Sequence, residues 1–261
     1  MTPSSKRVAL VTGVGRRAGI AAAVAQALAA DGWNLLLNYW RPYGDEVPLP
    51  AGEHDAAELA EELRSAGTEV ALHEDDLTDP EAPARIMDTA EAGFGLGSVG
   101  ALISAAAHST NDGVLSVTSE AFDKHIHANA RGTLLLTQEF ARRFERNSAT
   151  GHVVNFTTGL PLKDEIAYAA SKAAIEAITQ SSALELAHLG IRVNCIDPGP
   201  NDTGWMTPEL LESVGERIPL GRAGTPADVA PLVAFLCSDA GAWITGQIIH
   251  CDGGWSTADS L

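Results

Sequence analysis

The sequence predicts an α/β fold, in which a doubly wound parallel sheet of seven strands carries helices on both faces. Three observations lead to this fold class. Short runs of β-branched and aliphatic residues alternate with longer helical patterns from end to end. A glycine-rich turn directly follows the first apolar run. No linker-like segment divides the 261 residues, so we expect a single domain over residues 1–261.

Seven apolar runs have the length and composition of buried strands. The expected strands are residues 8–12, 33–38, 69–73, 99–104, 152–157, 192–196 and 247–251. Apolar stripes between them predict helices, the first of which should end at Gly32 and the second at Gly67. Two long helical patterns, residues 119–146 and 165–189, flank the fifth strand. Residues 41–52 hold three prolines and two glycines, so we expect a long loop that is mobile without its ligand.

Composition argues against several classes of function. The net charge of −17, with only 17 lysines and arginines, argues against nucleic-acid binding. The three cysteines are far apart and the histidines are scattered, so we expect neither a disulfide framework nor a metal site. No apolar stretch approaches the ~20 residues of a membrane span. We therefore expect a cytoplasmic protein that does not associate with a membrane.

The glycine-rich turn lies between the first strand and the first helix. It contains Gly13, Gly15 and Gly19, and Ile20 begins the helix. In this position backbone N–H groups and the positive end of a helix can bind the pyrophosphate of a dinucleotide. The alternative is a tight strand-to-helix turn with no ligand. Its place after the first strand favours the dinucleotide.

The end of the second strand favours NADP(H) over NAD(H). An NAD-binding domain usually places an acid there for the ribose hydroxyls, but residues 38–41 contain none. Arg16 and Arg17 in the turn, with Arg41 after the strand, are placed to pair with a 2′-phosphate. The alternative is that some of these arginines are only solvated. Asp76, past the third strand, either reaches the adenine or is a turn residue.

Tyr168 and Lys172 are four positions apart near the start of the last long helical pattern. This spacing puts both side chains on one face of a helix, where an ammonium favours the ionised form of a phenol. An isolated phenol titrates near pH ~10, so a neighbouring positive charge brings proton transfer closer to neutral pH. Such pairs also occur by chance on solvated helices. The catalytic interpretation therefore depends on the rest of the chain.

Taken in order, these features resemble the short-chain dehydrogenase/reductase family over essentially the whole chain. The matching positions are residues 12–19, Asp76, Asn129, residues 153–156, Tyr168, Lys172, residues 193–194, 198–199, 244–247 and 252–254. Within the family the chain looks most similar to the 3-oxoacyl-acyl-carrier-protein reductases. The resemblance implies a Rossmann fold, a small-molecule or acyl-thioester carbonyl substrate, and a homotetramer or homodimer.

The resemblance also implies roles for individual residues. Tyr168 would donate a proton to the carbonyl, Lys172 would hold the nicotinamide ribose, and Asn129 would organise a water that relays protons. Thr158 aligns with the serine that usually hydrogen-bonds the carbonyl. The other residues implied to contact the cofactor are Leu77, Ala105, Pro198, Gly199 and Thr203. The expected substrate contacts are His108, Leu160, Trp205 and Met206, although Trp205 and Met206 equally fit the packing of a short lid helix.

Some positions depart from the family pattern. Thr158 replaces the serine, and it lies ten positions before Tyr168, which is a shorter loop than usual. Leu189 stands where carrier-protein reductases often have a basic residue, which leaves Arg142, Arg143 and Arg146 as a candidate basic patch. The leading hypothesis is an NADPH-dependent reductase of a ketone. The alternatives are a catalytically inactive NADP(H) sensor and an NAD-dependent alcohol or sugar dehydrogenase.

Overall fold

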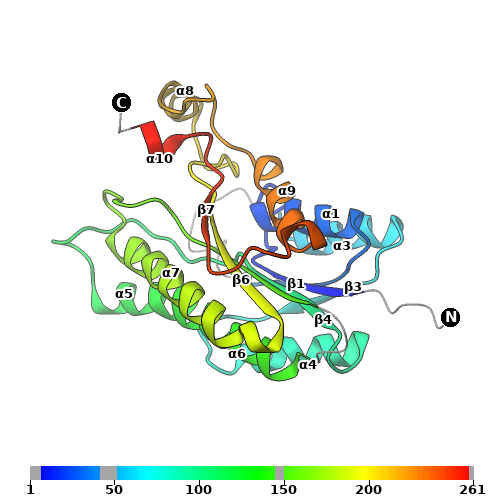
Figure 1. Cartoon of the computed structure of the whole chain (residues 1–261). Helices are drawn as coiled ribbons and strands as arrows, with labels where there is room; N and C mark the ends of the chain where they lie inside the picture. Colours follow the sequence, from blue (N-terminus) through cyan, green and yellow to red (C-terminus); the bar gives the residue numbers. More distant parts are fainter. Residues whose placement is uncertain (1–6, 42–51, 145–149, 259–261) are drawn as a thin grey trace.

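A parallel sheet of seven strands forms the centre of the molecule, in the order β3-β2-β1-β4-β5-β6-β7 (Figure 1). This computed structural model describes residues 7–41, 52–144 and 150–258. The strands are β1 (Val8–Thr12), β2 (Asn34–Tyr39), β3 (Val70–Glu74), β4 (Val99–Ser104), β5 (Gly151–Phe156), β6 (Ile191–Asp197) and β7 (Ile248–His250). All seven predicted strands are present, and no bound differs from its prediction by more than one residue.

Helices cover both faces of the sheet, which confirms the predicted doubly wound Rossmann fold. One face carries α1 (Ile20–Ala30), α3 (Asp55–Ser65) and α9 (Pro226–Leu236). The other face carries α4 (Ala82–Phe94), α6 (Gly132–Arg143) and α7 (Ile166–Leu186). The other α-helices of the described ranges are α5 (Ser119–His125), α8 (Pro208–Arg217) and α10 (Trp255–Ala258). None of the helices in the described ranges is long and apolar enough to cross a bilayer.

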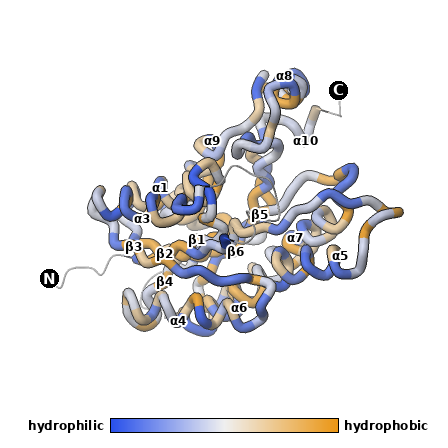
Figure 2. The backbone as a smooth tube through the Cα atoms, turned by 180° about the vertical axis from the view of Figure 1, so that it is seen from behind, coloured by the Kyte–Doolittle hydropathy of each residue, from blue (hydrophilic) through white to orange (hydrophobic). Residues whose placement is uncertain are grey.

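The central strands are apolar along their whole length because both of their faces are covered. Every residue of β1 and β4 is buried, whereas most of the edge strands β3 and β7 is only partly buried. Figure 2 shows the apolar colour gathered on the strands, with hydrophilic stretches on the surrounding helices and loops. The sheet therefore supplies a rigid core, and the polar chemistry falls to the loops at its edges.

The long helical pattern predicted over residues 119–146 is interrupted. The structure contains α5, a π-helical turn at Ile126–Arg131 and then α6, which ends at Arg143. A π-helical turn inserts one residue into the helical ladder, and such turns often occur at functional sites. This one contains Asn129. Most of the loop predicted over residues 41–52 lies outside the described residues.

A crevice forms where the strand order reverses, between β1 and β4. Gly13 follows β1 directly and has φ +81°, and a β-carbon at Gly13 would lie 2.7 Å from the Cα of Ala106. The hydroxyl of Thr12 also accepts a hydrogen bond from the N–H of Ala106 at 3.1 Å. Only glycine allows the turn after β1 to lie this close to the segment that follows β4.

Gly13→Ala is expected to lower the free energy of unfolding by about 1–3 kcal/mol from backbone strain alone, with the clash against Ala106 added. Gly15→Ala is the matched control, because its new β-carbon would meet nothing within 4 Å. We expect the control to stay within about 0.5 kcal/mol of the wild type. Urea unfolding of the ligand-free protein measures both values. Equal destabilisation by the two variants would contradict the packing described for Gly13.

Candidate active site

A cavity of about 330 Å³ opens beyond the carboxyl ends of β1, β2 and β4. The predicted cofactor and substrate residues in its lining are Gly13, Gly15, Arg16, Asp76, Leu77, Ala105 and His108. Tyr39, Trp40 and Lys124 also line it. The sequence prediction did not include these three, although the position of Tyr39 and Trp40 at the end of the second strand pointed to this crevice. The cradle around Gly13 and this lining fit the phosphates and adenosine of a dinucleotide.

The three arginines predicted to meet a 2′-phosphate point in different directions. Arg16 donates from Nη1 to the carbonyl oxygen of Thr203 at 2.9 Å and from Nη2 to the Thr203 hydroxyl at 3.3 Å. Arg17 forms an ion pair with Glu62 of α3. Arg41 donates from Nε to Glu74 at 2.9 Å and stays at the end of β2. The sequence could not reveal these partners, because they lie 33 to 187 residues away along the chain.

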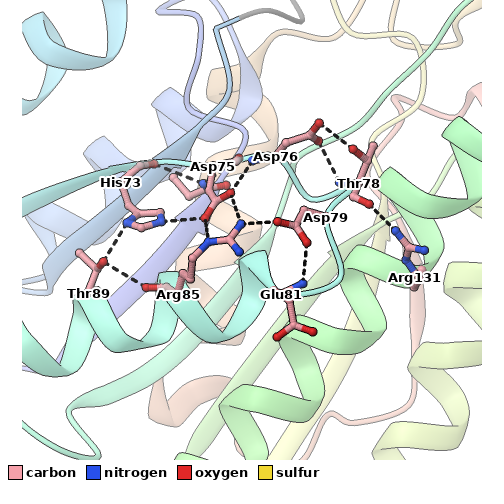
Figure 3. A network of polar contacts seen from close by, with 10 residues as sticks. His73, Asp75, Asp76, Thr78, Asp79, Glu81, Arg85, Thr89 and Arg131 are labelled. Atoms are coloured by element: carbon pink, nitrogen blue, oxygen red, sulfur yellow. Dashed lines mark hydrogen bonds and ion pairs between the residues drawn. The ribbon is translucent and has the colours of Figure 1, made fainter.

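Asp76 is held in a turn between β3 and α4 (Figure 3). Its carboxylate accepts hydrogen bonds from the N–H of Thr78 at 2.8 Å and from the Thr78 hydroxyl at 2.6 Å. Arg131, at the end of the π-helical turn, donates to the carbonyl oxygen of Thr78. The neighbouring Asp75 accepts two hydrogen bonds from Arg85. The carboxylate of Asp76 therefore holds this turn, and Asp76 also lines the cavity, where its contact with an adenine stays a prediction.

Tyr168 and Lys172 lie in the first two turns of α7, as predicted. The Nζ of Lys172 is 5.6 Å from the centroid of the Tyr168 ring and donates to the carbonyl oxygen of Phe156, at the end of β5, at 2.9 Å. Only 3% of Lys172 is exposed. Burial lowers the pKa of its ammonium from 10.5 to about 8, against a small opposing effect of Cys195. The pair is thus a buried lysine beside a partly buried phenol.

Asn129 is completely buried, and its side chain joins two segments of the site. Its Oδ1 accepts from the backbone N–H of His108 at 2.7 Å, and its Nδ2 donates to the carbonyl oxygen of His108 at 2.9 Å. Nδ2 also donates to the hydroxyl of Ser171 at 2.9 Å, one residue before Lys172. Asn129 therefore ties the segment that follows β4 to the helix that carries Tyr168.

The two threonine hydroxyls after β5 have different surroundings. Thr157 is buried, and its hydroxyl donates to Glu176 at 2.8 Å and to the carbonyl oxygen of Lys172 at 3.2 Å. Thr158, in contrast, is partly exposed. Of the two hydroxyls, that of Thr158 is the more accessible, and its contact with a substrate carbonyl stays a prediction.

The four predicted substrate residues fall into different environments. His108 is buried in the cavity wall, whereas Leu160 and Trp205 each expose half of their surface. Met206 is buried in a small apolar cluster with Val214 of α8. Met206 thus fits the lid-packing interpretation. Trp205, whose Nε1 donates to the carbonyl oxygen of Asn201 at 2.9 Å, remains a candidate for substrate contact.

The turn after β6 is fixed by the buried side chain of Asp197. Asp197 accepts the N–H of Gly199 at 3.0 Å and a hydrogen bond from Nδ1 of His250 at 3.0 Å. A β-carbon at Gly199 would lie 2.5 Å from the Cβ of Asp252, and Gly199 has φ +61°. Pro198 and Gly199 therefore form a close-packed turn between β6 and the loop that carries Thr203.

The buried Lys172 gives a stability prediction that depends on pH. Its folded-state pKa is about 8 and its unfolded value is 10.5, so the unfolded chain binds one more proton between these pH values and stability rises with pH there. Below pH about 8 the buried charge costs about 3 kcal/mol, at ~1.4 kcal/mol for each pKa unit. Lys172→Met removes this slope. Urea unfolding of both proteins from about pH 7 to about pH 10 tests it, and parallel stability profiles would contradict it.

Known proteins resemble this chain in both sequence and fold. A sequence model described as enoyl-(acyl carrier protein) reductase matches residues 13–256. The chain is 39% identical to the uncharacterized oxidoreductase YjdA of Bacillus subtilis, over 98% of this chain and 99% of that protein. It is 34% identical to an NADPH-dependent aldehyde reductase-like chloroplastic protein of Arabidopsis thaliana, over 97% and 95%.

A solved structure agrees with this placement. A short-chain dehydrogenase/reductase from Serratia marcescens superimposes with a TM-score of 0.84 at 26% identity, over 97% of this chain and 99% of that one. The matches cover nearly the whole chain. They agree with the strand order and with the glycine turn after β1. The chain belongs to the short-chain dehydrogenase/reductase family.

Proposed function

We propose that this chain is an NADPH-dependent reductase that converts a small carbonyl compound to an alcohol. The observation that carries the proposal is the position of Lys172, buried beside Tyr168 at the carboxyl edge of the sheet that also bears the dinucleotide cavity. Burial lowers the pKa of Lys172 to about 8, which shows that the fold spends free energy to bury its ammonium group. Ionisable groups with shifted pKa values concentrate at functional sites.

In the proposed reaction each side chain has a separate task. Tyr168 donates its phenolic proton to the carbonyl oxygen, and the Lys172 ammonium stabilises the phenolate that remains. Thr158 donates a hydrogen bond to the same carbonyl and orients it. Asn129 keeps His108 and Ser171 in place around the pair and is the proposed organiser of a proton-relaying water. The nicotinamide ring supplies the hydride when the dinucleotide is bound.

The preference for NADPH is supported by charge at the end of β2. No acid follows this strand up to Arg41, and Arg41 lies there beside Trp40 of the cavity wall. The relative from Arabidopsis is named as NADPH-dependent. Gly13, Gly15 and Gly19 are the proposed pyrophosphate contacts, with Ile20 at the helix start. Thr203, held by Arg16, is proposed to reach the nicotinamide carboxamide together with Pro198 and Gly199.

The proposed substrate is a free small aldehyde or ketone, although a 3-oxoacyl thioester stays within the proposal. Two arginines of the candidate basic patch are paired with acids: Arg142 pairs with Glu139, and Arg143 pairs with Glu139, Asp88 and Glu91, while Arg146 lies outside the described residues. A net charge of −17 also repels an acidic carrier protein. These charges favour a substrate that reaches the site without a protein partner.

The proposal includes assembly and location. We propose a homotetramer or homodimer formed by this single domain, supported by Leu134 of α6 and Leu184 of α7, which are exposed on neighbouring helices. We propose residence in the cytoplasm, supported by the free thiols of Cys195, Cys237 and Cys251. Sedimentation that shows a monomer at micromolar concentration would remove the assembly from the proposal.

Tyr168→Phe removes the proposed proton donor and keeps the ring. We expect turnover to fall by about 10²-fold or more, because general acid catalysis contributes on that scale. The NADPH dissociation constant should stay within about twofold of wild type, since the cavity lining does not include Tyr168. Steady-state kinetics and fluorescence titration measure the two quantities. A full rate in Tyr168→Phe would refute the role of the phenol.

Arg41→Ala tests the cofactor preference. Removing a charge-assisted contact to a phosphate costs about 1.5–3 kcal/mol, so we expect NADPH affinity to fall about tenfold or more and NADH affinity to change little. Arg17→Ala is the matched control: both arginines pair with a glutamate, but the ion pair of Arg17 with Glu62 directs it to α3, whereas Arg41 stays at the end of β2. It should leave both affinities within about twofold of wild type. If Arg41→Ala weakens NADH and NADPH equally, Arg41 does not select the 2′-phosphate.

A further inference from the structure

The helix that carries Tyr168 has no N-terminal cap of its own. The residue before α7, Glu165, has φ −146° and makes no side-chain capping hydrogen bond. The first N–H groups of a helix have no acceptor within the helix, so they need one from outside. Tyr168 is the third residue of α7. A group that accepts hydrogen bonds from these N–H groups therefore also fixes the first turn of α7, which carries the Tyr168 side chain.

Asp112 supplies this acceptor from another loop. It lies between β4 and α5, and its Oδ1 accepts the backbone N–H of Ala167, the residue before Tyr168, at 3.2 Å. The backbone N–H of Asp112 donates to the carbonyl oxygen of Asp164 at 2.9 Å. Asp164 has φ +61°, an uncommon conformation for a residue other than glycine. Asp112 thus clamps both the helix start and the left-handed residue that leads into it.

The same two loops make a second contact. The hydroxyl of Ser109 donates to the carboxylate of Glu165 at 3.4 Å. Burial raises the pKa of Glu165, the Ser109 hydrogen bond opposes this, and the charge of Asp112 raises it further. Asp112 is therefore close enough to Glu165 to act on its charge.

We propose that Asp112 is a positioning residue for carbonyl reduction, which sets the place of Tyr168 by capping α7 from the loop that follows β4. The inference rests on the proposed function. A lost cap costs about 1 kcal/mol of stability, but a shift of about 1 Å in a reacting group costs up to about 10²-fold in rate. The effect on turnover should therefore exceed the effect on stability.

Two substitutions of Asp112 separate the cap from the charge. Asp112→Ala removes the acceptor, so we expect kcat to fall by about 10- to 100-fold. Asp112→Asn keeps an oxygen that can accept the Ala167 N–H, and it should retain kcat within about threefold of wild type. The KM of the carbonyl and the NADPH dissociation constant should change by less than about threefold in both variants, because Asp112 is not part of the cavity lining.

Thr118→Ala is the matched control. Thr118 ends the same loop and caps α5 through the N–H of Ala121 at 3.1 Å, so its loss costs the same kind of hydrogen bond at another helix. We expect a similar fall in melting temperature and a kcat within about threefold of wild type. Equal losses of kcat in Asp112→Ala and Thr118→Ala would overturn the proposal, and so would a loss of kcat in Asp112→Asn as large as in Asp112→Ala.

Asp112→Glu is the substitute variant if Asp112→Ala does not fold. It keeps the charge but displaces the acceptor oxygen, so its kcat should be well below that of Asp112→Asn. The reverse order of the two kcat values would overturn the proposal.

If the wild type reduces no carbonyl, the proposed function fails. Hydrogen exchange of the amides of residues 166–169 then decides whether Asp112 caps α7. Exchange should be faster in Asp112→Ala and unchanged in Asp112→Asn, and equal rates in all three proteins would overturn the capping role.

Discussion

The buried ammonium group of Lys172 connects the helix α7 to the central sheet. Lys172 projects from α7 toward the sheet, and its Nζ donates to the carbonyl oxygen of Phe156 at the end of β5. Burial of a charged lysine costs free energy, and this cost lowers the pKa of Lys172 to about 8. The sheet and the position of α7 together bury the lysine beside the phenol of Tyr168.

The surroundings of this lysine come from segments that are distant in the sequence. Asn129, in a π-helical turn, holds the segment after β4 against Ser171, and Thr157 bonds α7 from the end of β5. On the other side of the strand-order reversal, Gly13 allows the turn after β1 to approach Ala106. The dinucleotide cavity lies at the ends of β1, β2 and β4, and the helix that carries Tyr168 is bonded to the end of β5, which is the neighbour of β4 in the sheet.

The sequence predicted the strands and the crevice well, because both follow from local patterns. Apolar runs locate buried strands, and a glycine turn after the first strand marks the dinucleotide end of the sheet. The sequence did not predict the partners of charged side chains. Arg17 turns to Glu62 and Arg16 to Thr203, contacts that depend on how α3 and the loop after β6 pack. The π-helical turn was missed because its residues also fit an uninterrupted helix.

The most direct test of the account is the fate of NADPH when the purified chain is mixed with a panel of aldehydes, quinones and cyclic ketones. The account predicts loss of NADPH absorbance with at least one of these carbonyls, and one alcohol formed for each NADPH oxidised. NADPH binding without formation of alcohol from any carbonyl would contradict it. That result would make the buried lysine part of a dinucleotide sensor.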